Sequence, residues 1–139
     1  MTSKQDFFLD PALEVDPGEV KWYFISDYYD GPIAGLAVFR GRILWFSCFE
    51  EDIAQHTLYV LQELSDEELE YEIEQKERFE RMVGTHLSFD LSGEPLPRVT
   101  ASEECQARYF RECEHERFFL GPLPRPIVAW FDVEPRKAD

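Results

Sequence analysis

Basic residues are scarce in this sequence. Lys and Arg together number 14 in 139 residues, against 29 Asp and Glu, so the formal net charge is −15. A polyanion repels both the phosphates of nucleic acids and anionic membrane surfaces. The composition therefore argues against direct nucleic-acid binding and against membrane association. Cationic proteins, cations and neutral ligands remain as candidate partners.

Cysteine is also scarce, and long hydrophobic runs are missing. Cys48, Cys105 and Cys113 match no spacing typical of a zinc site or a disulfide framework. Uncharged runs such as residues 31–39 and 43–49 are too short to span a bilayer. The first residues lack the apolar core of a secretory signal peptide. We therefore expect a cytoplasmic protein with free thiols.

Motifs for common enzyme chemistry are lacking as well. The sequence has no glycine-rich phosphate loop and no G-x-S-x-G around a serine. One short loop does contain the residue types of a nucleophile, a base and an orienting group: Thr85, His86, Ser88 and Asp90. They are too close in sequence for the usual assembly of a catalytic triad. We expect no enzymatic activity and no cofactor.

What the sequence does have is enough apolar material for the core of one domain. Hydrophobic residues make up 44% of the chain and aromatic residues 15%. Apolar runs between residues 20 and 63, with turns at Gly31-Pro32 and at residues 40–42, predict a four-stranded antiparallel meander. Gly35 is expected to let backbone or an aromatic ring approach its strand. Residues 1–19 are expected to form an irregular arm.

Two helices and a last strand are expected to follow. Ser65 and Glu68 form a capping-box pattern at the start of a helix over residues 65–83, whose apolar stripe comprises Leu69, Ile73, Phe79 and Val83. A shorter helix over 100–115 would begin at Thr100, and a final strand is expected over 126–134. The predicted fold class is α+β. It is a twisted antiparallel meander, curling toward a small barrel, with one long acidic helix and one shorter helix.

The acidic helix carries the strongest candidate for a binding surface. Residues 50–80 contain twelve Asp or Glu and only two basic residues, and helical spacing brings five of the acids close together: Asp66, Glu67, Glu70, Glu74 and Glu77. They could form a docking face for a basic protein partner, which electrostatic steering would favour. The alternative is a solvated face, neutralised by Glu72–Lys76, Glu74–Arg78 and Glu77–Arg81 pairs at i,i+4.

Two other groups of residues are weaker candidates. Tyr28 and Tyr29 are suited to an exposed binding rim, and together with Asp27 and Asp30 they would form the site of a sugar-binding or small-molecule-binding barrel, including a hydrolytic one. Glu112 and His115 have the Glu-x-x-His spacing of di-iron bundles, which need two such motifs and four helices. A single copy predicts an exposed helix end, so we expect no metal site. The sequence leaves monomer and homodimer open.

Three segments carry a resemblance to a protein family. "YYDGPIAGLAVFRGRILWF", "LSDEELEYEIEQKERFERMVGTH" and the closing "AWFD" resemble a family of small, acidic, uncharacterised bacterial proteins, over most of the chain from about residue 27. The resemblance implies no activity and transfers no site residues. In size and acidity the chain is similar in kind to immunity and inhibitor proteins of bacterial conflict systems.

Overall fold

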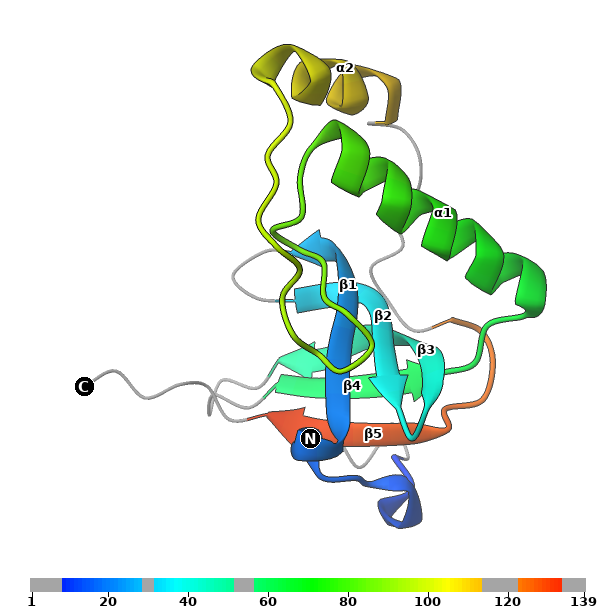
Figure 1. The fold of residues 1–139 in the computed structure, drawn as a ribbon. Helices are drawn as coiled ribbons and strands as arrows, with labels where there is room; N and C mark the ends of the chain where they lie inside the picture. Colours follow the sequence, from blue (N-terminus) through cyan, green and yellow to red (C-terminus); the bar gives the residue numbers. More distant parts are fainter. Residues whose placement is uncertain (1–8, 29–31, 52–56, 114–122, 134–139) are drawn as a thin grey trace.

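The computed structural model describes residues 9–28, 32–51, 57–113 and 123–133. Its centre is a five-stranded antiparallel sheet in the order β1-β2-β3-β4-β5 (Figure 1). The strands are β1 (Val20–Tyr28), β2 (Pro32–Phe39), β3 (Arg42–Glu51), β4 (Thr57–Gln62) and β5 (Ala129–Val133), and the helices are α1 (Asp66–Met82) and α2 (Glu103–Cys113). The α+β class and the meander are confirmed. The sheet is open, with β1 and β5 at its two edges, and does not close into a barrel.

The β2–β3 hairpin turns where the sequence predicts. Arg40 and Gly41 form a two-residue loop between the paired residues Phe39 and Arg42. Both loop residues have positive φ, 51° at Arg40 and 77° at Gly41. This is the backbone of a type I′ turn, whose twist matches that of the flanking strands.

Gly35 in β2 lies against neighbouring backbone and an aromatic ring, as the sequence predicts. A Cβ atom at this position would lie 2.1 Å from the carbonyl oxygen of Phe24 and 3.0 Å from the ring of Phe46. The β1–β2 ladder is irregular on both sides of the Ile25–Gly35 pair. Glycine therefore permits β1 to bend tightly over β2 at this point.

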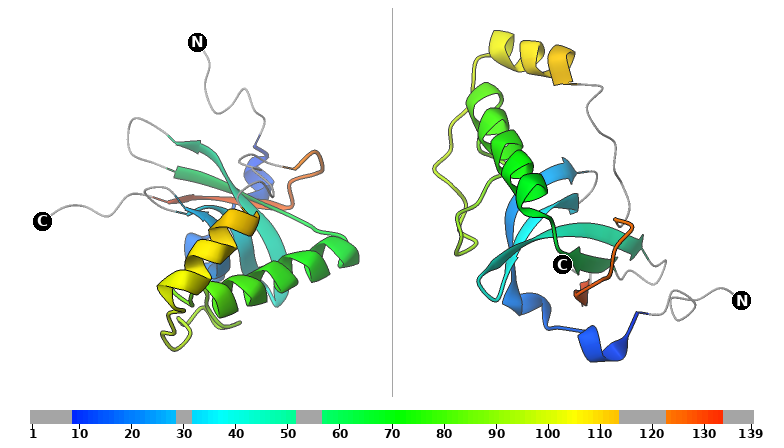
Figure 2. Two further views of the ribbon diagram at one scale, coloured as in Figure 1. Left: turned by 90° about the horizontal axis from the view of Figure 1, so that it is seen from above. Right: turned by 90° about the vertical axis from the view of Figure 1, so that its right-hand side faces the viewer.

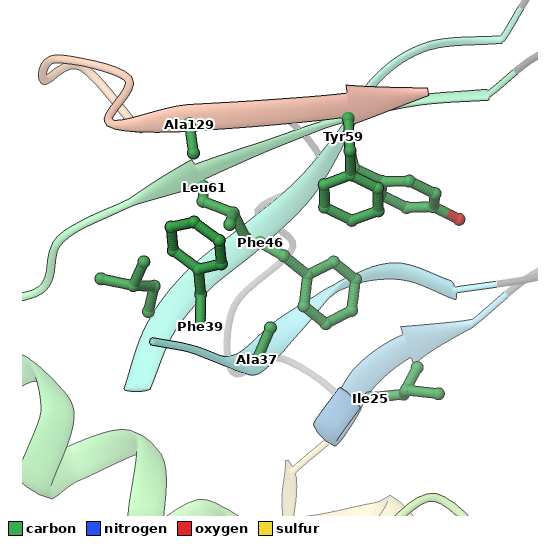
Figure 3. Packing of buried hydrophobic residues seen from close by; sticks show 9 residues of the cluster. Ile25, Ala37, Phe39, Phe46, Tyr59, Leu61 and Ala129 are labelled. Atoms are coloured by element: carbon green, nitrogen blue, oxygen red, sulfur yellow. The ribbon is translucent and has the colours of Figure 1, made fainter. Parts of the chain in front are cut away.

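The sheet curls around its main hydrophobic core. Figure 3 shows side chains from both halves of the sheet pointing toward one another inside the curl. This cluster includes Ile25 of β1, Phe46 of β3 and Phe131 of β5. The rings of Trp22 and Phe131 lie 6.2 Å apart although their strands form opposite edges of the sheet. The two edges thus share one core without sharing hydrogen bonds.

Helix α1 packs on the other face of the sheet (Figure 2). Leu69, Ile73 and Phe79 contact a second buried cluster, which contains Phe24, Ala34, Leu36 and Trp45. The capping box is confirmed: the Ser65 amide donates to Glu68 Oε1 at 2.8 Å, and the Glu68 amide donates to Ser65 Oγ at 3.1 Å. The apolar stripe therefore fixes the orientation of α1, and its acidic side faces away from the sheet.

Three boundaries differ from the sequence-based expectations. Helix α2 begins at Glu103 because Ser102 Oγ accepts a hydrogen bond from the Cys105 amide, whereas Thr100 forms a bridge with Gly84. The last strand begins at Ala129, after the proline-containing segment. The described part of the arm is ordered into two short 3₁₀ helices, Pro11–Leu13 and Pro17–Glu19.

Candidate functional site

The five predicted carboxylates lie together on the exposed side of α1. Asp66, Glu67, Glu70, Glu74 and Glu77 are all exposed, and we call this set the acidic face. At a rise of 1.5 Å per residue, the acidic face extends over about 16 Å of helix. Within the described ranges, none of its side chains takes part in a salt bridge. The five carboxylates of the face therefore have no ion-pair partner in the part of the chain that the structure describes.

Two of the three basic residues of α1, Lys76 and Arg78, make contacts with other parts of the protein. Lys76 is buried and forms a 2.7 Å ion pair with Glu80, with its Nζ 4.6 Å from the centre of the Tyr23 ring. Arg78 reaches α2, where it lies 3.7 Å from Glu112. No ion pair between Glu74 and Arg78 is found among the described residues. Two of the three cations that were expected to neutralise the acidic helix therefore contact β1 and α2, whereas the third, Arg81, is exposed in the last turn of α1.

A pocket of about 380 Å³ lies beside the first turns of α1. It is lined by residues from β3, the β4–α1 connection, α1 and the segment before β5: Trp45, Leu64, Glu67, Glu68, Tyr71, Glu72 and Leu123. Trp45 is 2% exposed, whereas Tyr71 is 44% exposed. The charged residues of the lining are all glutamates, and the other lining residues are apolar or aromatic. Glu67 belongs both to the pocket and to the acidic face.

Gln62 fixes the far wall of the pocket. This side chain, at the end of β4, is fully buried. Its Nε2 donates to the carbonyl oxygens of Leu123 and Arg125, both at 2.8 Å. Its Oε1 accepts a hydrogen bond from the Leu123 amide at 2.9 Å. One amide group therefore satisfies three backbone groups of the segment that carries Leu123.

Arg125 connects the same segment to α1. Its Nη1 and Nη2 donate to the two carboxylate oxygens of Glu68, at 2.7 and 2.9 Å. Nη1 also donates to the carbonyl oxygen of Glu63. The hydrogen bonds from Arg125 and from the Ser65 amide lower the pKa of Glu68 to about 2, because they stabilise the carboxylate. The Glu68 carboxylate thus has a structural role, since Arg125 and the Ser65 amide already donate hydrogen bonds to it.

The tyrosine-rich turn after β1 was the second predicted site. Tyr29 and Asp30 lie outside the described residues, as do the side chains of Asp27 and Tyr28. The backbone of Asp27 and Tyr28 belongs to β1, where it pairs with Ala34 and Pro32. The sugar-site hypothesis and the aromatic rim therefore stay predictions.

The Glu-x-x-His candidate has its glutamate in an ion-pair network. Glu112 contacts Arg78 of α1 at 3.7 Å and Arg108 of α2 at 3.2 Å, and His115 lies outside the described residues. In the described part of the chain, no group of three or more His, Cys, Asp or Glu side chains could hold a metal ion. Glu112 thus has a structural role in joining the helices.

The loop with serine, histidine and aspartate does not assemble a triad. Ser88 is buried, whereas His86 and Asp90 are exposed. Asp90 Oδ1 accepts hydrogen bonds from the hydroxyl and amide of Ser92 and from the Glu94 amide. The Ser92 hydroxyl contributes most to lowering the pKa of Asp90. The carboxylate is therefore used to hold the turn.

Sequence reasoning missed the residues that build the pocket around α1. Gln62 and Arg125 gave no motif, and Trp45 was expected only as a core residue. One signal was present: Gln62 is a polar residue in the apolar run "LYVLQ", and a buried polar group needs partners. Which segment supplies those partners is a property of the tertiary structure.

Comparisons with known proteins give no identity for this chain. No family model, no curated protein and no solved structure matches it. The resemblance to small acidic bacterial proteins therefore stays a prediction. Neither helix in the described ranges is long and apolar enough to cross a membrane.

Proposed function

We propose that this protein is a non-enzymatic interaction module that binds a basic protein partner through the acidic face of α1. The observation that carries the proposal is the set of exposed carboxylates without ion-pair partners among the described residues. Like charges on one helix repel one another and reduce its stability. A basic partner relieves this repulsion, and the field of the acidic face steers its approach.

The solvated-face alternative loses part of its support. It depended on Lys76, Arg78 and Arg81 neutralising the glutamates one turn earlier, and of these Arg81 is exposed on α1. Lys76 is instead buried beside Tyr23, and Arg78 extends to Glu112. An inhibitor or immunity role is the most specific form of the proposed function, because the similarity in size and acidity suggests it.

The test is a pull-down from native lysate in low and in physiological salt, with identification by mass spectrometry. Wild-type protein is compared with Glu70→Lys/Glu74→Lys/Glu77→Lys. The matched control is Glu14→Lys/Glu94→Lys/Glu104→Lys, which makes the same change in net charge at other exposed positions. We expect one partner to bind wild type and control but not the α1 variant. Equal recovery by all three proteins would contradict a role for the acidic face.

A further inference from the structure

The pocket beside α1 has the size of a site for one side chain. Its volume of about 380 Å³ is close to the lower end of the range for ligand sites. A strand or a helix does not fit in such a space, whereas one long side chain or a small molecule does. The pocket therefore accommodates one long side chain or one small molecule.

The lining favours a side chain with an apolar stem and a cationic head. Leu64, Leu123 and Trp45 supply apolar walls, and Tyr71 supplies a partly exposed ring. The charged residues of the lining are glutamates, and Arg125 already binds Glu68. Glu67 is exposed and has no ion-pair partner among the described residues. A long basic side chain matches both features, because its stem is aliphatic and its head is charged.

The protein's own contacts show that a basic side chain suits this combination, since Lys76 Nζ lies 4.6 Å from the centre of the Tyr23 ring and 2.7 Å from a carboxylate oxygen of Glu80. Between α1 and α2, the guanidinium of Arg78 lies 5.8 Å from the centre of the Tyr109 ring and 3.7 Å from a carboxylate oxygen of Glu112. The pocket offers the same two groups in Tyr71 and Glu67, one helical turn apart. A guanidinium is planar, stacks on aromatic rings and is less strongly hydrated than an ammonium. These properties of the head group, rather than the protein's own contacts, favour arginine over lysine.

We infer that the pocket binds an arginine side chain presented by the basic partner. The inference rests on the proposed function and names the group that the partner inserts. Glu67 connects the pocket to the acidic face, so a basic segment lying along α1 can place one arginine in the pocket. The remaining carboxylates then contact its other basic residues.

The test measures binding of blocked single residues to the full chain. Nα-acetyl-arginine amide is titrated into ¹⁵N-labelled protein and followed by NMR, beside the corresponding amides of citrulline, lysine and norleucine. Citrulline keeps the shape of arginine without its charge, and norleucine keeps only the stem. We expect arginine to bind at least about tenfold more tightly than citrulline, with shifts at Tyr71 and Leu123.

Two variants and a matched control locate the site. Glu67→Gln is expected to weaken arginine binding about tenfold, since it removes the carboxylate that meets the guanidinium. Tyr71→Leu keeps an apolar wall and should weaken arginine binding without weakening norleucine binding. Glu74→Gln removes the same charge from the acidic face outside the pocket and should change affinity by less than roughly twofold.

Several results would overturn the inference. These are equal binding of arginine and citrulline, tighter binding of lysine or norleucine, no binding of any probe, or equal effects of Glu67→Gln and Glu74→Gln. The triple α1 variant of the pull-down leaves every pocket residue unchanged. Loss of the partner in that variant without arginine binding to the wild type would support the acidic face and reject the arginine site. Arginine binding to the wild type, together with a partner still bound by the triple variant, would support the arginine site and reject the acidic face.

Discussion

Arg125 binds Glu68 through both terminal nitrogens of its guanidinium, although the two residues lie 57 positions apart. Glu68 is also the capping-box residue of α1. One carboxylate thus fixes the start of the helix and the segment that leads to β5. The pocket lies between these two elements, so its shape depends on this contact.

The Arg125–Glu68 contact should make stability depend on pH. Glu68 has a pKa of about 2 in the folded protein and an ordinary value of 4.5. The contribution is therefore present above about pH 4.5 and is lost as the pH falls toward 2. Arg125→Gln should destabilise the protein modestly at neutral pH, because Glu68 is partly exposed and solvent screens the contact. Urea unfolding at pH 7 and pH 2.5 measures this difference, which should shrink at the lower pH.

The exposed arginine at position 98 provides the control for that experiment. Arg98→Gln should change stability by less than about 0.5 kcal/mol at either pH. A destabilisation by Arg125→Gln that is as large at pH 2.5 as at pH 7 would contradict ionic binding of Glu68.

Replacement of Gln62 should destabilise the protein more strongly. Gln62→Met keeps the size of the side chain but leaves backbone groups of Leu123 and Arg125 without their partner. Since these groups are partly buried, we expect a loss of about 2–4 kcal/mol. Chemical denaturation measures the loss, and hydrogen exchange should show faster exchange of the Leu123 amide. Gln106→Met, which removes one hydrogen bond to Ala101, should cost about 1 kcal/mol. Similar costs for the two variants would argue against the special role of Gln62.

Gly35 and Gly41 should respond differently to alanine. Gly35→Ala would force a Cβ atom to within 2.1 Å of the Phe24 carbonyl oxygen. The β1–β2 ladder must then shift, and we expect a cost of about 3 kcal/mol or more. Gly41→Ala meets no atom within 4 Å and adds only the strain of its positive φ, about 1–2 kcal/mol. Thermal unfolding of both variants measures the two losses of stability. A smaller loss for Gly35→Ala than for Gly41→Ala would contradict the close approach of position 35 to the Phe24 carbonyl oxygen.

Tyr109 should hold α2 in place. Its ring lies 5.5 Å from that of Phe79 and 5.8 Å from the Arg78 guanidinium, so it connects α2 to α1. Tyr109→Ala should speed amide exchange in α2 by about tenfold and leave the sheet unchanged, because α2 opens as a local unit. Phe110→Ala is the control, since Phe110 is 52% exposed beside it. Equal exchange rates in the two variants would contradict this role.

Local sequence signals predicted the elements well. The Ser65–Glu68 capping box and the stripe of Leu69, Ile73 and Phe79 placed α1 correctly, because both depend on residues within a few turns. The Arg40–Gly41 hairpin was equally local. The start of α2 was wrong because Thr100 and Ser102 are both good capping residues, and the bridge between Thr100 and Gly84 decides between them.

The pocket could not be predicted in the same way. Its walls come from β3, the β4–α1 connection, α1 and the segment before β5. The periodicity of a helix or a strand gives no information about distances between such elements. The acidic face was predictable from spacing alone. Its lack of ion-pair partners among the described residues was not predictable, because that depends on the tertiary contacts of Lys76 and Arg78.

The contact between Trp22 and Phe131 has a consequence for how the chain folds during synthesis. The cluster inside the curl needs Ala129 and Phe131 from the last described strand. When β1 to β4 and both helices have left the ribosome, this cluster still lacks Phe131, whose ring contacts those of Tyr59 and Trp22. The nascent chain therefore exposes aromatic surface until residues 129–133 emerge. Pairing of β5 with β4 then completes the sheet and its core.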